Sequence, residues 1–379
     1  MVQFLTEGER KTRRRIARRW VGMGFLVFIL IIWAGLLYQS SPGSRNEKAV
    51  MAKPAGPVYH FEFRQVRDSD KIDLFINGKF FTAYCYNEHL KKPVLFPVLT
   101  ASGKTVTRGW PLEPRPFEPV DHPHHYGISL THGDVNGLDF WSNTDSVPED
   151  RKMHYGSINQ QSFLQIKSGN NEGILETACT WDRPDGRTLM DEKSTYIFKA
   201  DTGLRIIDRI TTLTARDIDV RFNDTKEGMY TIRVAREMEQ PSFDARIYLD
   251  EHLKRTGYKV DNNGITGLYE NSEGQSGDDV WGKRARWVIL SSRLEGEPVS
   301  IIMFDNPKNP NFPAHWMARG YGLFGINAFG SSAYTDGKES LNYFLEAGKS
   351  VTFRYRIAIV DGYKPDKQEI ERLYNKFIK

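Results

Sequence analysis

The chain has 379 residues, and its 52 lysines and arginines exceed its 48 aspartates and glutamates by four. Six of these basic residues cluster between Lys11 and Arg19. The rest of the chain therefore has no basic excess, which argues against a nucleic-acid partner. The roughly 320 residues after residue 57 are enough for one large hydrophobic core or two smaller ones.

An apolar segment without any charge follows the basic cluster and runs from Trp20 to Tyr38. At about 1.5 Å per residue it spans roughly 28 Å, close to the hydrocarbon thickness of a bilayer, whereas the apolar part of a cleavable signal rarely exceeds about 15 residues. We therefore predict an uncleaved transmembrane signal-anchor at 20–38, with a cleaved signal peptide as the alternative. The arginines keep the basic arm, residues 1–19, in the cytoplasm, so the chain is predicted to be a single-pass protein of the cytoplasmic membrane with its C-terminal part in the periplasm.

Residues 39–57 are rich in Ser, Pro, Gly, Asn, Lys and Ala, which cannot bury enough apolar surface to fold. We expect a flexible tether here, followed by one exported domain at 58–379 that no second linker interrupts. The two cysteines, Cys85 and Cys179, lie in strand-like runs. We expect them to be buried free thiols, with a disulfide as the alternative that an exported compartment allows.

Apolar and polar residues alternate with period two along most of the domain, and turn residues separate the alternating runs. This pattern predicts antiparallel sheets, and the absence of βαβ spacing in the sequence favours an all-β fold, a large antiparallel β-sandwich. The predicted strands are 59–66, 71–76, 80–86, 162–166, 173–181, 193–199, 204–213, 230–235, 286–291, 299–304 and 351–360.

A C-terminal amphipathic helix is predicted after Asp366, because Glu369 follows three residues later as its capping-box partner. The apolar residues of this segment fall at i, i+3, i+4 and i+7, and they form one stripe that should dock on a sheet. They are Ile370, Leu373, Tyr374 and Phe377.

The stretch from Asp121 to Trp141 concentrates groups that transfer protons or bind metals near neutral pH. It holds four of the nine histidines, His122, His124, His125 and His132, and three carboxylates, Asp121, Asp134 and Asp139. We expect the chemistry here. The alternative is a polar loop with capping side chains, since Asn136-Gly137 is also a strong hairpin signal.

Geometry divides these histidines into two groups. If residues 126–131 form a straight strand, His125 and His132 lie about 23 Å apart and cannot share a metal. One group would be His122, His124 and His125, and the other would be His132, Asp134 and Asp139, gathered by the turn at 133–137. A bend at Gly127 that merges the two groups is the alternative.

The proline-rich segment 306–316 carries His315 beside Trp316 and is predicted to be a functional loop rather than a strand or helix. Loops of antiparallel sandwiches gather at the ends of the sheets, so His315 and Arg319 could meet one of the histidine groups across a cleft. A structural histidine is the alternative for His315. The aromatic residues Trp141, Trp316 and Phe329 could stack on a sugar ring or simply fill the core.

Arg233 lies among apolar residues in a predicted strand that Glu227 precedes. A buried arginine must be paired, so it either forms a structural salt bridge with Glu227 or Asp224 or orients a substrate carboxylate or hydroxyl pair.

Several segments of the chain resemble a bacterial family of unknown function, DUF6807. They are 122–125, 132–141, 227–228 with 232–235, 306–307 with 312–316, and 321–330, the last of which contains Asn327. The family is similar in overall look to the β-supersandwiches of galactose mutarotases and other carbohydrate-processing enzymes, so the resemblance implies a supersandwich fold and sugar chemistry outside the cytoplasm. The family is often labelled a methane oxygenase, but a methane monooxygenase membrane subunit needs several spanning helices and this chain offers one.

We therefore predict an enzyme that acts on carbohydrate by His/Asp acid–base chemistry, with a divalent metal as an optional cofactor. A non-catalytic carbohydrate-binding module is the first alternative, and a copper oxygenase is a disfavoured second. The candidate catalytic residues are His124, His125, His132, Asp134, Asp139 and His315. The candidate substrate-binding residues are Arg233, Glu227, Arg319, Trp141, Trp316 and Asn327.

Overall fold

A computed structural model describes residues 57–379, apart from residues 66 and 68. The predicted basic arm and membrane helix, and all of the predicted tether except residue 57, lie outside the described residues. Within the described part, no helix has both the length and the apolar character needed to cross a bilayer.

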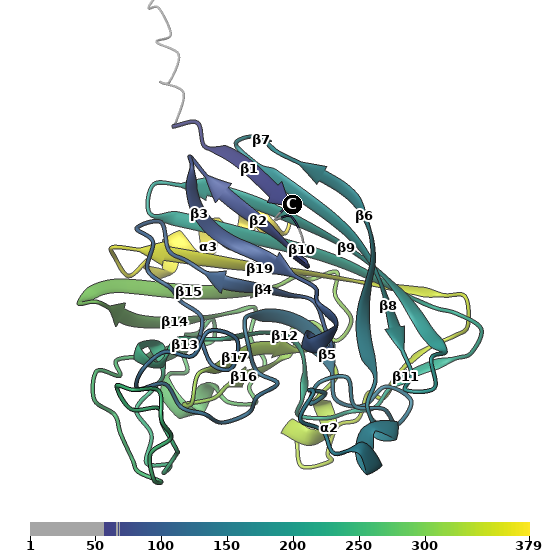
Figure 1. The fold of residues 1–379 in the computed structure, drawn as a ribbon. Coiled ribbons are helices and arrows are strands. Elements are labelled where there is room, and N and C mark those ends of the chain that lie inside the picture. Colours follow the sequence, from purple (N-terminus) through teal and green to yellow (C-terminus); the bar gives the residue numbers. More distant parts are fainter. Residues whose placement is uncertain (1–56, 66, 68) are drawn as a thin grey trace, which may run out of the picture. The chain divides into compact units, whose positions relative to one another are not determined.

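The described residues fold into three antiparallel sheets of nine, eight and two strands (Figure 1). The nine-stranded sheet has the order β16 (His315–Ala318), β17 (Leu323–Asn327), β12 (Gly228–Arg233), β5 (Ile128–His132), β4 (Val94–Val98), β3 (Lys79–Cys85), β2 (Lys71–Ile76), β1 (His60–Gln65) and β7 (Gly169–Asn170). The eight-stranded sheet has the order β13 (Leu268–Asn271), β14 (Trp287–Leu294), β15 (Glu297–Asp305), β19 (Ser350–Asp361), β10 (Leu204–Ala215), β9 (Thr188–Asp201), β8 (Gly173–Asp182) and β6 (Ser157–Lys167). β11 (Val220–Phe222) pairs with β18 (Tyr343–Leu345).

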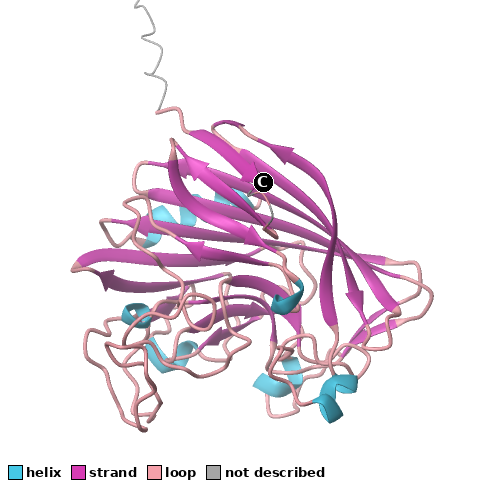
Figure 2. Cartoon of the chain, viewed as in Figure 1, coloured by secondary structure: helices cyan, strands magenta, loops and turns pink. Residues whose placement is uncertain are grey.

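Strands dominate the described part of the chain, and its helices are short (Figure 2). In the described part of the chain they are the α-helices α2 (Ser331–Tyr334) and α3 (Lys367–Phe377) and the 3-10 helices η1 (Glu88–Leu90), η2 (Glu149–His154), η3 (Arg236–Met238) and η4 (Gly277–Val280). The predicted all-β antiparallel fold is therefore confirmed. Every predicted strand overlaps an observed strand of the two large sheets.

The main core lies between the two large sheets, because alternate residues of each strand point inward. On β12, Tyr230 stacks on Tyr355 of β19 with ring centroids 5.3 Å apart, and Ile232 is also in this core. Thr231 and Arg233 alternate with them and therefore point to the opposite face of the sheet. That outer face carries the candidate site.

The segment 306–316 was predicted to be a loop throughout, but its last two residues begin β16. Its prolines, Pro307, Pro310 and Pro313, occupy only the first part of the segment. Residues 314–316 contain no proline, so each has a backbone N–H that can pair in a sheet. His315 pairs with Asn327 in the ladder with β17. The prediction was wrong for this end of the segment.

Both cysteines are free. The Sγ of Cys179 donates to Gln160 Oε1 at 3.3 Å, and the Sγ of Cys85 donates to Phe96 O at 3.4 Å. Burial raises the pKa of each thiol to about 12, so both are inert thiols rather than nucleophiles.

The predicted C-terminal helix is α3, and its capping box is present: Asp366 accepts from the Glu369 backbone N–H, and Glu369 accepts from that of Asp366. Its apolar stripe packs on the outer face of the eight-stranded sheet, where Ile370 and Tyr374 are buried against Trp287 and Phe304.

We predict that Asp366→Ala lowers the free energy of unfolding by about 1 kcal/mol, because the helix loses its N-cap. Ile370→Ala should cost about 2–5 kcal/mol, since it leaves a cavity under the helix. Denaturant unfolding of the purified chain measures both effects. Lys376→Ala, at an exposed position of the same helix, should change stability by less than about 0.5 kcal/mol; equal losses for all three variants would contradict the docking described here.

Candidate functional site

A cluster of buried charges supports the outer face of the nine-stranded sheet. Asp121 Oδ1 accepts from Arg108 Nη1 at 2.6 Å and from Arg233 Nη2 at 2.8 Å. The side chains of both arginines have no exposed surface. Burial would raise the pKa of Asp121, but Arg233, His122 and Arg108 together hold it below its usual range. The carboxylate is therefore ionised at any physiological pH.

Arg233 does not form the predicted salt bridge with Glu227 or Asp224. It is the last residue of β12, whereas those carboxylates precede the strand. Its second acidic neighbour is Glu239, whose Oε1 lies 3.8 Å from Arg233 Nη2 and whose Oε2 accepts from Arg246 Nη2 at 2.6 Å. Three arginines thus share two buried carboxylates.

His122 connects this charged cluster to the protein surface. Its Nδ1 lies 3.4 Å from Asp121 Oδ1, and 42% of its side chain is exposed. Its ring is stacked on the rings of both His125 and Tyr321, with centroid distances of 4.9 Å in each case. Its backbone has a φ of 43°, a conformation that non-glycine residues rarely adopt. Asp121 and the two stacked rings together fix the orientation of this imidazole.

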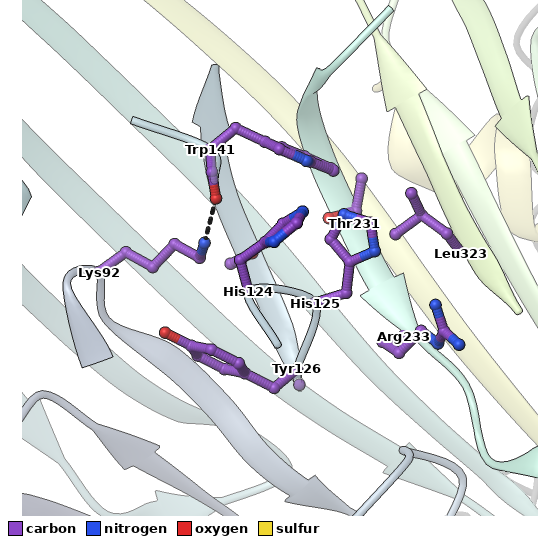
Figure 3. Close-up of a pocket in the computed structure, with 10 residues that line it drawn as sticks. Lys92, His124, His125, Tyr126, Trp141, Thr231, Arg233 and Leu323 are labelled. Atoms are coloured by element: carbon purple, nitrogen blue, oxygen red, sulfur yellow. Dashed lines mark hydrogen bonds between the residues drawn. The ribbon is translucent and has the colours of Figure 1, made fainter. Parts of the chain in front are cut away.

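His124 and His125 line a small pocket with Lys92, Trp141 and Arg233 (Figure 3). The centroids of the two imidazole rings are 4.1 Å apart. Burial, reinforced by nearby positive charges, lowers the pKa of His124 to about 2 and also lowers that of His125. Both rings are therefore neutral at physiological pH. The remaining space in the pocket is too small for a water molecule.

Lys92 is a buried lysine that the sequence did not single out. It is 3% exposed, and its Nζ donates to Trp141 O at 2.7 Å. Burial lowers its pKa to about 7, although the charge of Asp139 opposes this. No sequence signal separates Lys92 from its neighbour Lys91, whose side chain is exposed enough to pair with Asp145.

An open cleft surrounds Tyr321 on the other side of His122. One hollow of about 360 Å³ is lined by His122, Tyr321, Arg246 and Tyr258. A second, of about 470 Å³, is lined by Tyr321, Arg319, Trp281 and Phe243. Tyr321 and Asp244 line both hollows, so the two hollows are parts of one cleft.

Guanidinium groups hold the aromatic floor of the cleft. Arg319 lies over the ring of Trp281 at 3.6 Å and within 6.0 Å of Tyr321. Arg233 lies 4.8 Å from the Tyr321 ring centroid. The sequence predicted Arg319 and Arg233 but missed Tyr321, Trp281, Phe243 and Tyr258, because single aromatic residues in loops carry no pattern.

Glu227, just before β12, is close enough to Arg319 and His122 for their charges to act on its carboxyl group. Burial nevertheless raises its pKa, because the desolvation of the carboxylate outweighs the attraction of Arg319, Lys226 and His122. Lys226, at 4.0 Å, is the only ion-pair partner of the Glu227 side chain in the described part of the chain.

His132 lies apart from the histidine pocket and is fully buried. Its Nε2 is 2.8 Å from Asn223 O, and its ring packs against Phe222 and Phe329. Burial lowers its pKa to about 4. The prediction that His132 belongs to a different group from His124 and His125 is consistent with its absence from their pocket.

The carboxylates predicted to join His132 hold local backbone instead. Asp134 Oδ1 accepts from Gly137 N and from Asn223 Nδ2, both at 2.9 Å. Asp139 Oδ1 accepts from Trp141 N and Ser142 N at 2.7 and 2.8 Å. Asn136 and Gly137 have φ values of 52° and 81°, as the hairpin signal predicted.

The remaining candidates also have structural partners. His315 Nδ1 is 2.7 Å from Gly282 O, and its ring stacks on Tyr334. Trp316 is in the core and donates from Nε1 to Ala285 O at 2.8 Å. Asn327 Nδ2 donates to Thr225 O at 2.9 Å, and Phe329 is fully buried. The ring centroids of Trp141 and His125 are 5.1 Å apart. Of the three aromatic residues predicted to contact a sugar, Trp141 lines the histidine pocket, whereas Trp316 and Phe329 do not.

Among residues 57–379, leaving aside 66 and 68, no group of three or more His, Cys, Asp or Glu side chains is arranged to hold a metal ion. The rings of His122, His124 and His125 meet through their faces and edges. The optional divalent metal of the sequence prediction has no preformed set of ligands here.

A family model described as a family of unknown function, DUF6807, matches residues 71–375. No curated protein matches the chain. Among solved structures, the Slr1438 protein from Synechocystis is similar at 8% identity and a TM-score of 0.32, over 80% of this chain and 96% of that one. Galactose 1-epimerase from Lactobacillus acidophilus is similar at 10% identity and a TM-score of 0.33, over 80% of this chain and 99% of that one. The GH36 α-galactosidase AgaB from Geobacillus stearothermophilus is similar at 12% identity and a TM-score of 0.34, over 83% of this chain and 41% of that one. With TM-scores this low, these similarities carry no argument about function.

We predict that His132 makes the fold sensitive to acid. Its pKa is about 4 in the folded chain and about 6.5 when unfolded, so the unfolded chain binds the extra proton between these values. The free energy of unfolding is therefore unaffected by His132 above pH 6.5, and it falls by about 1–3 kcal/mol as the pH is lowered toward 4. Denaturant unfolding from pH 7.5 to 4.5 should show a weaker pH dependence for His132→Asn than for the unchanged chain.

His252→Asn is the control for this measurement, because His252 is an exposed histidine with 72% side-chain exposure. It should leave the pH dependence of stability unchanged. An identical pH dependence in His132→Asn and the unchanged chain would refute the assignment of His132 as a buried neutral histidine.

Proposed function

The chain belongs to the DUF6807 family, whose function is unknown, and we propose from its own side chains that it is an enzyme acting on carbohydrate by acid–base chemistry in the cleft around Tyr321. The observation that carries the proposal is the placement of His122. It is an oriented, partly exposed imidazole backed by a buried carboxylate and facing an open hollow.

His122 has the arrangement expected of a general base. Asp121 is ionised and lies beside Nδ1, so Nδ1 carries the proton and the lone pair is on Nε2. The buried arginines Arg108 and Arg233 hold the carboxylate in place. An imidazole oriented in this way can remove a proton from a hydroxyl or carbon of a bound substrate.

Glu227 is the natural partner for the opposite proton transfer. Burial raises its pKa, and a carboxyl group whose pKa is raised is better suited than an ordinary one to donate a proton to a departing or developing oxygen anion. Arg319 acts on the same carboxyl group and lines the cleft, where its guanidinium can stabilise negative charge on a substrate oxygen. In this proposal His124 and His125 support the ring of His122 rather than react themselves, because their lowered pKa values keep both rings neutral.

The exposed aromatic residues of the cleft favour a sugar as the substrate. Phe243 and Tyr258 are 95% and 76% exposed, and both line the cleft. An exposed aromatic ring is costly unless it meets a partner, and its flat face suits the C–H face of a pyranose. Asp244 and Arg319 between these rings can bind hydroxyl groups.

The first alternative is a non-catalytic carbohydrate-binding module, and the same exposed aromatic residues favour it. The two functions differ in whether His122 is needed for turnover or only for contact. The oxygenase alternative lacks a ligand set to support it in the described residues.

Other parts of the sequence prediction are retained as part of this proposal. They are the supersandwich type of the fold, the single membrane helix at 20–38, the periplasmic location of the domain and the absence of a nucleic-acid partner. An epitope and protease-accessibility assay on intact cells and spheroplasts tests the topology.

We predict that His122→Asn lowers turnover by about 10²–10⁴-fold, because it removes the base and keeps a polar side chain of similar size. Its free energy of unfolding should change by less than about 1 kcal/mol, since His122 is partly exposed. The full chain would be incubated in D₂O with a panel of mono- and oligosaccharides, and NMR would follow deuterium incorporation, epimerisation and bond cleavage together.

His89→Asn is the matched control. His89 also lies beside an aspartate, with its Nδ1 2.7 Å from Asp145 Oδ2, but it is exposed and does not line the cleft. It should keep full turnover. If the unchanged chain binds a sugar but converts none, the binding module is correct; if His122→Asn converts sugars at the unchanged rate, His122 is not the base.

A further inference from the structure

The small pocket around His125 is rich in hydrogen-bond donors. In the described part of the chain, no carboxylate side chain lines it. We call it the donor pocket and define it by Lys92, His124, His125, Trp141 and Arg233. Two of these residues have basic side chains that are at least nine-tenths buried: Lys92 is 3% exposed and Arg233 is 1% exposed.

Several donors of this pocket have no partner in the described part of the chain. They are Trp141 Nε1, Arg233 Nε and Nη1, and whichever ring nitrogen of His125 carries the proton. The ammonium of Lys92 has three N–H groups and meets one acceptor there, Trp141 O. Buried donors without acceptors are costly, so the pocket is incomplete without an acceptor-rich group.

Carboxylates of the protein do not fill this role, because none is among the described residues that line the pocket. Asp121 Oδ2 and Glu239 Oε1, in the adjoining charged cluster, have no hydrogen-bond partner in the described part of the chain. Asp121 binds Arg108 and Arg233 from outside the pocket, and Asp139 accepts from the backbone N–H groups of Trp141 and Ser142. Neither Asp139 nor any other described carboxylate lies within ion-pair distance of Lys92 Nζ. The adjoining charged cluster has more cations than anions. In the described part of the chain its three arginines, Arg108, Arg233 and Arg246, share two carboxylates, those of Asp121 and Glu239.

The donor pocket adjoins the cleft. His125 stacks on His122, and His122 lines the hollow beside Tyr321. His124 is the partly exposed member of the pocket, whereas His125 is 5% exposed. Since the pocket holds no space for a water molecule, a ligand group enters when a side chain moves, and His124 is the least buried of the five.

We propose that the donor pocket binds the carboxylate of an acidic sugar, a uronate, whose ring lies on Tyr321 in the cleft. This inference rests on the proposed function for the position of the ring. Lys92 and Arg233 supply the positive charge, and the indole N–H of Trp141 and an imidazole N–H supply directed hydrogen bonds. A neutral sugar of the same stereochemistry leaves these donors unpaired, so the pocket selects acidic sugars.

The test is calorimetric titration of the full chain with glucuronate and galacturonate and with their neutral counterparts glucose and galactose. At least one uronate should bind at least tenfold more tightly than its neutral counterpart. Lys92→Met should abolish this preference, bringing the affinity for the uronate down to that for its neutral counterpart. Since the substitution removes a buried cation and keeps the length of the side chain, the protein should stay folded.

Lys91→Met is the matched control, because it removes the same charge from the adjacent residue, which pairs with Asp145 outside the pocket. It should bind both kinds of sugar like the unchanged chain. Trp141→Phe, which keeps an aromatic ring without the N–H, is measured alongside and should also lose preference for the uronate. Unfolding curves of all variants confirm that they are folded.

Three outcomes overturn the inference: no preference for either uronate, equal losses in Lys92→Met and Lys91→Met, or acetate or inorganic phosphate binding as tightly as the preferred uronate. The last outcome would assign the pocket to a free oxyanion. Turnover of neutral sugars without a uronate preference would leave the proposed function intact. A Lys92-dependent uronate preference without turnover of any sugar would uphold the inference and refute the enzymatic function.

Discussion

The structure of the candidate site depends on one carboxylate, the partly buried Asp121. Asp121 neutralises two guanidinium groups whose side chains have no contact with solvent, those of Arg108 and Arg233. A buried cation without a partner is strongly destabilising, and Asp121 is the carboxylate that both arginines contact. Glu239 also approaches Arg233, and four backbone carbonyls accept from Arg108. The same carboxylate lies beside His122 Nδ1. The interaction that makes burial of the arginines tolerable therefore also orients the imidazole.

The two faces of β12 explain how a β-sandwich keeps a polar site next to its core. Tyr230 and Ile232 point between the two large sheets and contribute to the main core, while Thr231 and Arg233 point the other way. On this outer face Trp141, from a loop, packs against Met317 of β16 and Leu323 of β17 in a smaller apolar cluster. The side chains of the site are thus held by strands on one side and by packed loops on the other, which limits their movement.

The site has two parts with different physical character. The cleft at Tyr321 is open, with aromatic side chains such as Phe243 exposed to solvent. The pocket behind His122 is closed, and its electrostatic interactions are stronger because water is excluded. His122 stands between them, in ring contact with His125 on one side and Tyr321 on the other. A substrate that reaches from the cleft into the pocket would pass this imidazole.

Local sequence patterns determined much of the fold. Period-two alternation predicted the long strands, the Asn136-Gly137 pair predicted the turn, and Asp366 with Glu369 predicted the cap of the last helix. These features follow from interactions between residues that are close in sequence, so they can be recognised without tertiary structure. Short strands such as β4 and β16 were missed or assigned to loops, because four or five residues around prolines carry too little periodicity.

The sequence also determined that the stretch from Asp121 to Trp141 contains functional candidates, but it could not rank its histidines. Only the tertiary structure decided that His122 is the exposed ring, that His132 is enclosed by Phe222 and Phe329, and that Lys92 joins the pocket from another loop. The pairing of Arg233 with Asp121, 112 positions away in the chain, was likewise invisible in the sequence. The physical reason is that burial and charge pairing depend on which distant segments meet, and the chain by itself specifies only the residue types that take part.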